Sequence, residues 1–270
     1  MIVDAHQHFW DPARGHYPFL DEVPSLRRRF GPEDVQAELD SNRVGASIVV
    51  QARSSLDETE ELLRIAEATP WVVGVVGWVD LTAPDDVAGT LDAFAGRGLV
   101  GVRHQVHDEP EPDWIVRSDV ERSLRAIADA DLAFDLLVRT RELAAAIACA
   151  RGNHDLRFIL DHVGKPPFGT PSMAAWRDGM AEIAQLPNVF CKLSGVLTET
   201  PDLALAADAI REAVELFGAD RCMFGSDWPV CLLAGGYTDA LDLVRSTIAP
   251  EVVPVVLSET AARAYGLELG

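Results

Sequence analysis

The chain has 270 residues, of which 48% are hydrophobic and 24% are charged. This length and composition suit one large domain or two small ones with a substantial apolar core. The net charge is -20 at neutral pH. A surface this acidic repels phosphate backbones and anionic lipids, so we expect binding neither to nucleic acid nor to a membrane.

The first residues resemble neither a secretion signal nor a membrane span. Asp4, His6 and His8 interrupt any apolar run there, and no stretch approaches the roughly 18 apolar residues that a span requires. The cysteines lack C-x-x-C spacing and lie within apolar segments, which indicates reduced, buried thiols; they are Cys149, Cys191, Cys222 and Cys231. We therefore expect a soluble, cytoplasmic protein.

Short apolar runs alternate with amphipathic stretches along the whole chain. Each run is nearly continuous in hydrophobicity, which is typical of strands covered on both faces and predicts a parallel sheet. The runs span residues 2–9, 46–53, 72–81, 99–105, 133–139, 157–164, 189–195 and 222–228.

The stretches between these runs carry helix signals. Ser118 to Glu121 matches a capping box, and Gly218 follows the last residue of another predicted helix. Predicted helices cover residues 32–45, 57–69, 141–151, 171–186, 202–217, 238–248 and 250–265, with one more beginning at residue 118.

About eight strand-helix units in this length predict a single-domain (β/α)₈ TIM barrel over residues 1–270, with an extra helix at the C-terminus. A doubly wound open sheet is the alternative. The chain has no G-x-G-x-x-G or P-loop after the first strand, which disfavours that alternative. We see no linker or solenoid repeat.

Polar residues end most of the predicted strands. In such a barrel the C-terminal strand ends converge on one pocket. Strict alternation along a strand places His6 and His8 on one face together with Asp4 and Ile2. The other strand ends supply Gln51, Arg53, Trp78, Asp80, Arg103, His104, Gln105, Asp135, Arg139, Asp161, His162, Lys192, Ser194, Ser226, Asp227 and Trp228.

The same alternation predicts which side chains enter the barrel. It turns His162 inward and Asp161 toward the helices, and it pairs Asp227 with the small Gly225. Arg103 and His104 point in opposite directions, so alternation alone does not decide which of them enters the pocket. For Arg53 and Arg139 we expect pairing with surface carboxylates.

Five segments in this order resemble the amidohydrolase superfamily, amidohydrolase-2 type. The nearest branch contains sugar lactonases, such as L-fuconolactonase and L-rhamnonolactonase, and 2-pyrone-4,6-dicarboxylate lactonase. The resemblance continues to Leu267 and so covers essentially the whole chain. The segments are His6-Gln-His8, Gly101-Val-Arg-His-Gln-Val-His107, Leu160-Asp-His-Val-Gly-Lys-Pro166, Val189-Phe-Cys-Lys-Leu-Ser-Gly195 and Met223-Phe-Gly-Ser-Asp-Trp-Pro229.

The resemblance implies that His6, His8, His162 and Asp227 form the ligand set of a metal. Binuclear relatives have a bridging lysine or glutamate on strand four and a histidine on strand five, and this chain departs from both positions, so two metals are not expected. The donor set suits one Zn²⁺ or Mn²⁺. Relatives include lactonases that work without an ion, and a metal-free mechanism stays open at this point.

The implied reaction is hydrolysis of a cyclic ester, most of all a sugar lactone. Asp227 acts as general base on water, and His162 with the other imidazoles, or their metal, polarises the carbonyl. The predicted substrate-binding residues are Gln51, Arg103, His104, His107, Lys192 and Trp228. For Lys192 the alternative role is to neutralise an inward carboxylate. His16 and His154 are predicted to lie in surface loops.

Four alternative functions remain at this stage. They are a pyrone dicarboxylate lactonase, a metal-dependent decarboxylase, a non-catalytic barrel that binds sugar acids, and a phosphotriesterase, which would normally need a second metal. The expected partner is a small-molecule lactone substrate. The sequence does not determine the oligomeric state.

Overall fold

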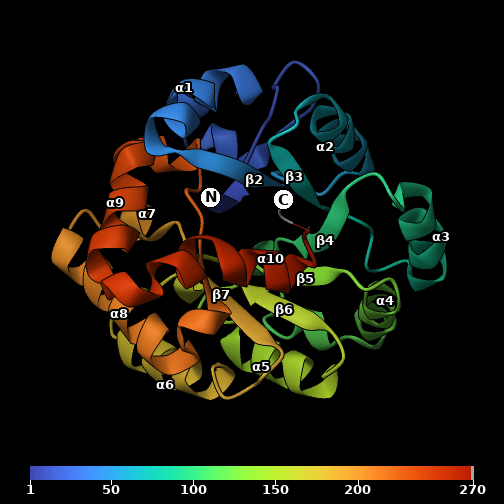
Figure 1. The fold of residues 1–270 in the computed structure, drawn as a ribbon. Helices are drawn as coiled ribbons and strands as arrows, with labels where there is room; N and C mark the ends of the chain where they lie inside the picture. Colours follow the sequence, from blue (N-terminus) through green and yellow to red (C-terminus); the bar gives the residue numbers. More distant parts are fainter. Residues whose placement is uncertain (269–270) are drawn as a thin grey trace.

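Eight parallel strands form one sheet in chain order, β1 to β8, in the computed structural model, which describes residues 1–268 (Figure 1). Parallel pairing of chain neighbours through a connecting helix is the repeating unit that the sequence predicts. The strands are β1 (Ile2–Gln7), β2 (Val44–Val50), β3 (Val72–Gly77), β4 (Leu99–His104), β5 (Ala133–Leu136), β6 (Arg157–Leu160), β7 (Val189–Leu193) and β8 (Cys222–Phe224).

The sheet closes on itself just beyond the ends of β1 and β8. Gln7 forms a parallel bridge with Trp228. The His8 amide donates to the Trp228 carbonyl at 2.7 Å, and the Asp227 amide donates to the His6 carbonyl at 2.8 Å. The prediction of a (β/α)₈ barrel is therefore confirmed, and the open doubly wound alternative is wrong.

The helices surround the barrel. They are α1 (Pro32–Asn42), α2 (Leu56–Ala68), α3 (Pro84–Phe94), α4 (Ser118–Asp129), α5 (Leu143–Gly152), α6 (Met173–Ile183), α7 (Val196–Glu199), α8 (Leu203–Phe217), α9 (Tyr237–Thr247) and α10 (Thr260–Tyr265). Two of them, α3 and the one-turn α7, are not among the predicted elements, although Pro84 begins α3 and Val87, Leu91 and Phe94 form its buried face.

The predicted closing helix is not regular. A 3₁₀ turn (Pro250–Val252) and a π-helical turn (Val255–Glu259) precede α10. Figure 1 shows α10 lying across the barrel opening near the N-terminus. Tyr265 donates from its hydroxyl to Asp135 at 2.9 Å, inside the barrel. The C-terminal helix therefore plugs the N-terminal end of the barrel.

The barrel interior is apolar in its lower part and polar near the C-terminal strand ends. Its apolar part contains residues from seven strands and from α10: Val3, Ala5, Ala46, Ile48, Val50, Val76, Ala133, Ile159, Phe190, Met223, Ala261, Ala264 and Tyr265. A larger apolar core lies between the strands and the outer helices. This arrangement leaves the C-terminal mouth for chemistry.

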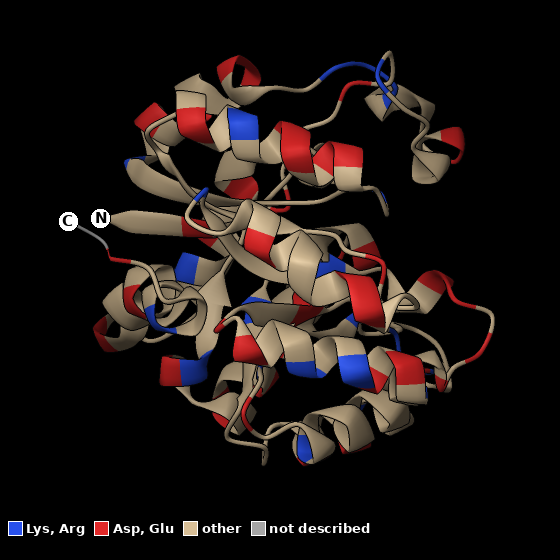
Figure 2. Ribbon diagram, turned by 90° about the vertical axis from the view of Figure 1, so that its right-hand side faces the viewer, with Lys and Arg blue, Asp and Glu red and all other residues tan. Residues whose placement is uncertain are grey.

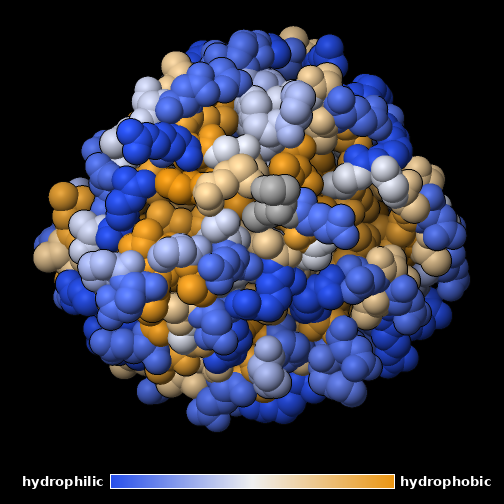
Figure 3. Space-filling model, viewed as in Figure 1, coloured by the Kyte–Doolittle hydropathy of each residue, from blue (hydrophilic) through white to orange (hydrophobic). Residues whose placement is uncertain are grey.

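Charged residues are spread over the outer helices and loops (Figure 2). Viewed from the N-terminal end, hydrophilic side chains ring the molecule and apolar ones are visible in the hollows nearer its centre (Figure 3). Among residues 1–268, no helix is both long and apolar enough to cross a membrane.

Candidate active site

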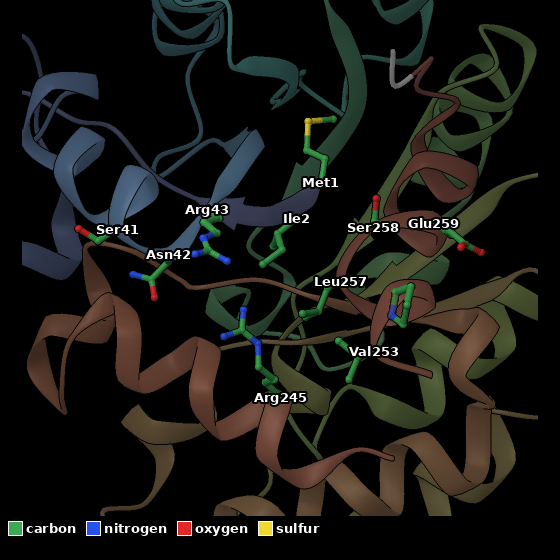
Figure 4. A pocket seen from close by; sticks show the side chains of 11 residues that line it. Met1, Ile2, Ser41, Asn42, Arg43, Arg245, Val253, Leu257, Ser258 and Glu259 are labelled. Carbon is green, nitrogen blue, oxygen red and sulfur yellow. The ribbon is translucent and has the colours of Figure 1, made fainter. Parts of the chain in front are cut away.

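Two large cavities lie at opposite ends of the barrel. The one at the N-terminal end measures about 840 Å³ and contains Arg43, Arg245 and Glu259 but no histidine (Figure 4). The other measures about 550 Å³ and is lined by residues that follow the strands, including His8, Arg103, His162 and Asp227. Only the second cavity brings together groups that can transfer protons or bind a metal.

An irregularity in β1 determines which of its side chains enter the barrel. The register of β1 against β2 shifts between Asp4 and Gln7. Asp4 points outward, where it accepts from the Tyr237 hydroxyl and the Ser226 amide, both at 2.9 Å. The prediction that Asp4 shares a face with the two histidines is therefore wrong, because a bulge breaks the alternation.

Each of the three predicted histidines has a polar neighbour at Nδ1, which is an oxygen for His8 and His162 and the Lys192 ammonium, at 3.1 Å, for His6. His8 Nδ1 lies 2.7 Å from the carbonyl of Val50, which can only accept, so the proton is on Nδ1. Nδ1 of His162 lies 2.9 Å from the hydroxyl of Ser194. Nδ1 of His6 lies 3.3 Å from a carboxylate oxygen of Asp161. Such partners orient an imidazole and leave Nε2 to face a ligand.

The free sides of these rings meet at Asp227. Nε2 of His6 and Nε2 of His8 are 3.1 Å apart, and Oδ1 of Asp227 lies 3.7 Å from the first and 3.4 Å from the second. The ring centroids of His6 and His162 are 4.6 Å apart. The four residues that the sequence singles out are brought together at one point.

His162 reaches this point by an unusual backbone conformation. Asp161 occupies the inward position at the end of β6, where it pairs with Arg103 and Lys192, so its predicted orientation toward the helices is wrong, whereas His162 enters the pocket as predicted. His162 and Val163 then adopt left-handed conformations, with φ of 54° and 53°. This conformation is strained for a branched residue such as valine, and such strain concentrates at functional sites. The turn swings the His162 ring into the pocket.

Burial and charge set the protonation of the cluster. Burial lowers the pKa of His6 well below its usual value, and the nearby Lys192 lowers it further. Burial does the same to the pKa of His162. Burial alone would raise the pKa of Asp227, but His162 and His8 bring it below the usual value. Neutral His6 and His162 therefore face an ionised Asp227.

These residues fit a single divalent cation. His6, His162 and Asp227 each offer a ligand atom, all within 4.8 Å of one another. The proton on Nδ1 of His8 leaves the lone pair of its Nε2 facing Nε2 of His6 across 3.1 Å. That contact requires either a proton on Nε2 of His6 or a cation beside both nitrogens. Three imidazoles and one carboxylate are ligands that suit Zn²⁺ or Mn²⁺.

A layer of buried charges lies directly beneath the cluster. Arg103 donates to Asp161 at 2.9 Å, and its Nη1 lies 3.3 Å from Nε2 of His6. Lys192 is fully buried and pairs with Asp135 and Asp161. Lys192 does not line the pocket, so of its two predicted roles the geometry matches neutralisation of inward carboxylates and not direct contact with substrate.

The other predicted substrate-binding residues divide into two groups. Arg103, His104 and His107 line the pocket, so both candidates on β4 reach it. Gln51 and Trp228 do not line it. Gln51 donates to the Arg103 carbonyl at 3.1 Å and so supports β4. The ring of Trp228 packs against Phe9 and Phe30 instead, and the prediction that these two side chains line the pocket is wrong.

His104 and His107 differ in what they can offer a ligand. Trp78 donates to Nδ1 of His104 at 3.2 Å, and Nε2 of His104 lies 2.7 Å from Glu109. His104 also stacks on Trp114, with 4.2 Å between ring centroids. Both of its nitrogens are thus engaged, whereas the buried Nδ1 of His107 has no hydrogen-bond partner in the described part of the chain.

Arg53 is a pocket residue that the sequence assigns elsewhere. It lines the cavity, and its guanidinium lies over the ring of Tyr17, 5.1 Å from the centroid. Within residues 1–268 the Arg53 guanidinium forms no ion pair, and only its backbone amide donates to a carboxylate, that of Glu58 at 2.9 Å, so the expected surface ion pair is wrong. Trp10 and Phe19 supply an apolar wall on the same side of the cavity. His16 also lines the cavity mouth, while its side chain is 72% exposed.

The sequence of the chain matches a known protein family over nearly its whole length. The sequence model of the family described as Amidohydrolase aligns with residues 3–267. The chain belongs to this family. Two curated relatives are both L-fucono-1,5-lactonases. The relative from Burkholderia ambifaria is 40% identical over 88% of this chain and 83% of its own, and that from Burkholderia multivorans is 37% identical over 99% and 96%.

A solved structure of similar sequence has the same fold. It is an amidohydrolase from Burkholderia multivorans with bound zinc, 35% identical, with a TM-score of 0.94 over 99% of this chain and all of its own. A zinc ion in that neighbour agrees with the metal-binding capacity of the His6, His162 and Asp227 group in this amidohydrolase.

Gly195 lies against the ring of His162, so a substitution at Gly195 tests the importance of the ring position. A Cβ on Gly195 would lie 2.5 Å from Nδ1 of His162, and the backbone there has a φ of 63°. We expect Gly195→Ala to displace the ring and to lower kcat/KM at least about 10²-fold, because a misplacement of about 1 Å has that effect on catalysis.

Gly96→Ala is the matched control. Gly96 has a φ of 72°, and a Cβ there meets nothing within 4 Å. Both substitutions therefore cost about 1–2 kcal/mol of backbone strain, but only the first should affect activity. We expect thermal unfolding to show a similar loss of stability in both variants. Equal activity of the two variants would contradict the role assigned to Gly195.

Proposed function

We propose that this amidohydrolase opens the ester ring of a small sugar lactone by hydrolysis, with Asp227 as the general base. The observation that carries the proposal is the meeting of Asp227 with His6, His8 and His162 at the floor of a cavity. The two L-fucono-1,5-lactonases among the relatives support the substrate class. The enzyme is thus a hydrolase acting on an ester bond.

The protonation of the cluster matches the needs of the reaction. The ionised carboxylate of Asp227 takes a proton from the attacking water, and after ring opening it returns that proton to the leaving alkoxide. His6, His8 and His162 would hold a divalent ion together with Asp227. When bound, such an ion supplies a Lewis acid for the lactone carbonyl and lowers the pKa of water. The neutral imidazoles are the forms that can bind it.

The pocket walls suit a ring that carries several hydroxyl groups. Arg103, His107 and Arg53 supply donors around the cavity, and Trp10 and Phe19 cover an apolar face of the ring. His104 acts as a wall, because both its nitrogens are already bonded. Lys192 acts from below, through Asp161 and His6.

A panel of γ- and δ-lactones with a pH indicator tests the function. We expect 1,5-lactones of six-carbon sugars, L-fucono-1,5-lactone among them, to be opened with a kcat/KM well above that for pyrone dicarboxylate. Release of carbon dioxide from aromatic acids would favour the decarboxylase alternative. Tight binding of a lactone that is recovered unchanged would favour a non-catalytic barrel.

Asp227→Asn should abolish turnover without unfolding the barrel. The amide keeps the size of the side chain but cannot accept the water proton, so we expect a loss of about 10²- to 10⁴-fold in kcat. Circular dichroism and the melting temperature check that the fold is retained. A folded variant that hydrolyses lactone at the wild-type rate would exclude Asp227 as the base.

The pH dependence of kcat/KM offers an independent check. Protonation of His6 or His162 would remove a ligand, and protonation of Asp227 would remove the base. Because all three pKa values are lowered, these losses occur only when the pH falls through the lowered values. We therefore expect kcat/KM to hold steady as the pH falls from about 7 past the ordinary histidine value of 6.5. Half-maximal activity near the ordinary histidine value of 6.5 would contradict this.

The proposed partner is the small-molecule lactone alone, and the proposed site of action is the cytoplasm. The net charge of -20 supports the expectation that neither nucleic acid nor an anionic membrane is bound.

A further inference from the structure

A second group of ligand-type side chains lies on the inner side of His6. His6, Asp135 and Asp161 each offer one ligand atom, and these atoms lie within 4.8 Å of one another. All three residues are fully buried. The outer side of the same imidazole belongs to the cluster with Asp227, so His6 stands between two sets of donors.

The ammonium of Lys192 is in contact with every member of this inner group. It is bonded to Asp135, and its Nζ lies 3.1 Å from Oδ1 of Asp161 and 3.1 Å from Nδ1 of His6. The side chain is fully buried. Two carboxylate oxygens and one imidazole nitrogen around one positive charge are the surroundings that a divalent cation would have.

The inner group requires positive charge. Two ionised carboxylates in a dry interior are unstable unless they are paired and hydrogen-bonded. Arg103 supplies one positive charge to Asp161 at 2.9 Å, and Lys192 supplies the second. One oxygen of this group, Oδ1 of Asp161, still has no hydrogen-bond partner of good geometry in the described residues. That orphaned oxygen faces Lys192 and His6.

We propose that Lys192 is a built-in cation that takes the place of a second metal ion, and that it thereby limits this centre to one ion and positions His6. The arrangement gives Nδ1 of His6 a carboxylate neighbour and an ammonium neighbour. The ammonium can only donate, so Nδ1 of His6 accepts its hydrogen bond at 3.1 Å, and the ring is held with Nε2 toward His8 in the outer cluster.

Removal of the ammonium should therefore create a metal site. In a Lys192→Ala variant, the space and the uncompensated charge of Asp135 and Asp161 remain, and His6 still borders them. Tyr265 continues to donate to Asp135 at 2.9 Å, so one partner of that carboxylate is kept. We expect the variant to bind one more Mn²⁺ or Zn²⁺ per chain than the wild type.

The measurement is the ratio of metal to protein after equilibrium dialysis against Mn²⁺, and separately Zn²⁺, followed by elemental analysis. Lys165→Ala is the matched control, because Lys165 also pairs with a carboxylate near the site, Glu199 at 2.7 Å, but does not touch the inner group. We expect a gain of one ion in Lys192→Ala and no gain in Lys165→Ala. An equal ratio in wild type and a folded Lys192→Ala variant would overturn the proposal.

A double variant covers the case in which Lys192→Ala folds poorly without metal. Lys192→Met with Asp135→Asn removes one negative charge together with the positive one, so it should fold and gain no ion. The single variant should instead show a rise in melting temperature of at least about 5 °C on addition of Mn²⁺, beyond that of the wild type. A single variant that stays unfolded in Mn²⁺ would also overturn the proposal.

These readouts do not depend on lactone turnover. The proposal rests on the one-ion centre of the proposed function, and the ratio is compared with that of the wild type, whatever its value. A wild-type enzyme that opens lactones while the variant gains no ion would refute the role of Lys192 and leave the proposed function in place.

Discussion

Closure of the barrel between β1 and β8 is the constraint on which the site depends. The backbone bonds from His8 to Trp228 and from Asp227 to His6 join two segments from opposite ends of the chain. They bring the imidazoles and the carboxylate to one point before any ligand is present. Gly225 is part of this constraint, because a Cβ there would lie 2.6 Å from Cβ of His6. The cost of the approach is a left-handed backbone at Asp227, with a φ of 58°.

The charges within the barrel are arranged in layers. Tyr265 plugs the N-terminal end and bonds to Asp135. Asp135, Asp161, Lys192 and Arg103 form a balanced layer above it. The histidines and Asp227 lie on top of this layer and face the cavity. Because the layer beneath is balanced, the cluster can keep neutral imidazoles beside an ionised carboxylate, which is the state that the hydrolysis needs.

The sequence predicted the architecture and the main cluster because both depend on repeated, local signals. Continuous apolar runs indicate buried parallel strands, and polar strand ends indicate where a barrel places its chemistry. His6, His8, His162 and Asp227 follow from these rules together with the family resemblance. Helix α3 also has a local sequence signal, because Pro84 stands at its start and Val87, Leu91 and Phe94 recur at helical spacing.

The remaining errors come from backbone irregularities that a side-chain pattern does not encode. A bulge in β1 turns Asp4 outward, and a left-handed turn after β6 lets both Asp161 and His162 face the barrel interior. Trp228 and Gln51 were wrongly predicted to line the pocket. A side chain at a strand end can instead pack against the elements around the pocket, as Trp228 does against Phe9 and Phe30. The pairing of Lys192 with two carboxylates depends on three different strands and has no local signature.

The most direct test of the account is a crystal structure of the enzyme grown with Zn²⁺ and the open-chain product of a sugar lactone, with the metal located by anomalous scattering. We expect one zinc peak per chain among His6, His8, His162 and Asp227, with the product in the cavity beside Arg103. A zinc peak elsewhere in the barrel, or product bound only in the cavity around Arg43 and Arg245, would contradict the account.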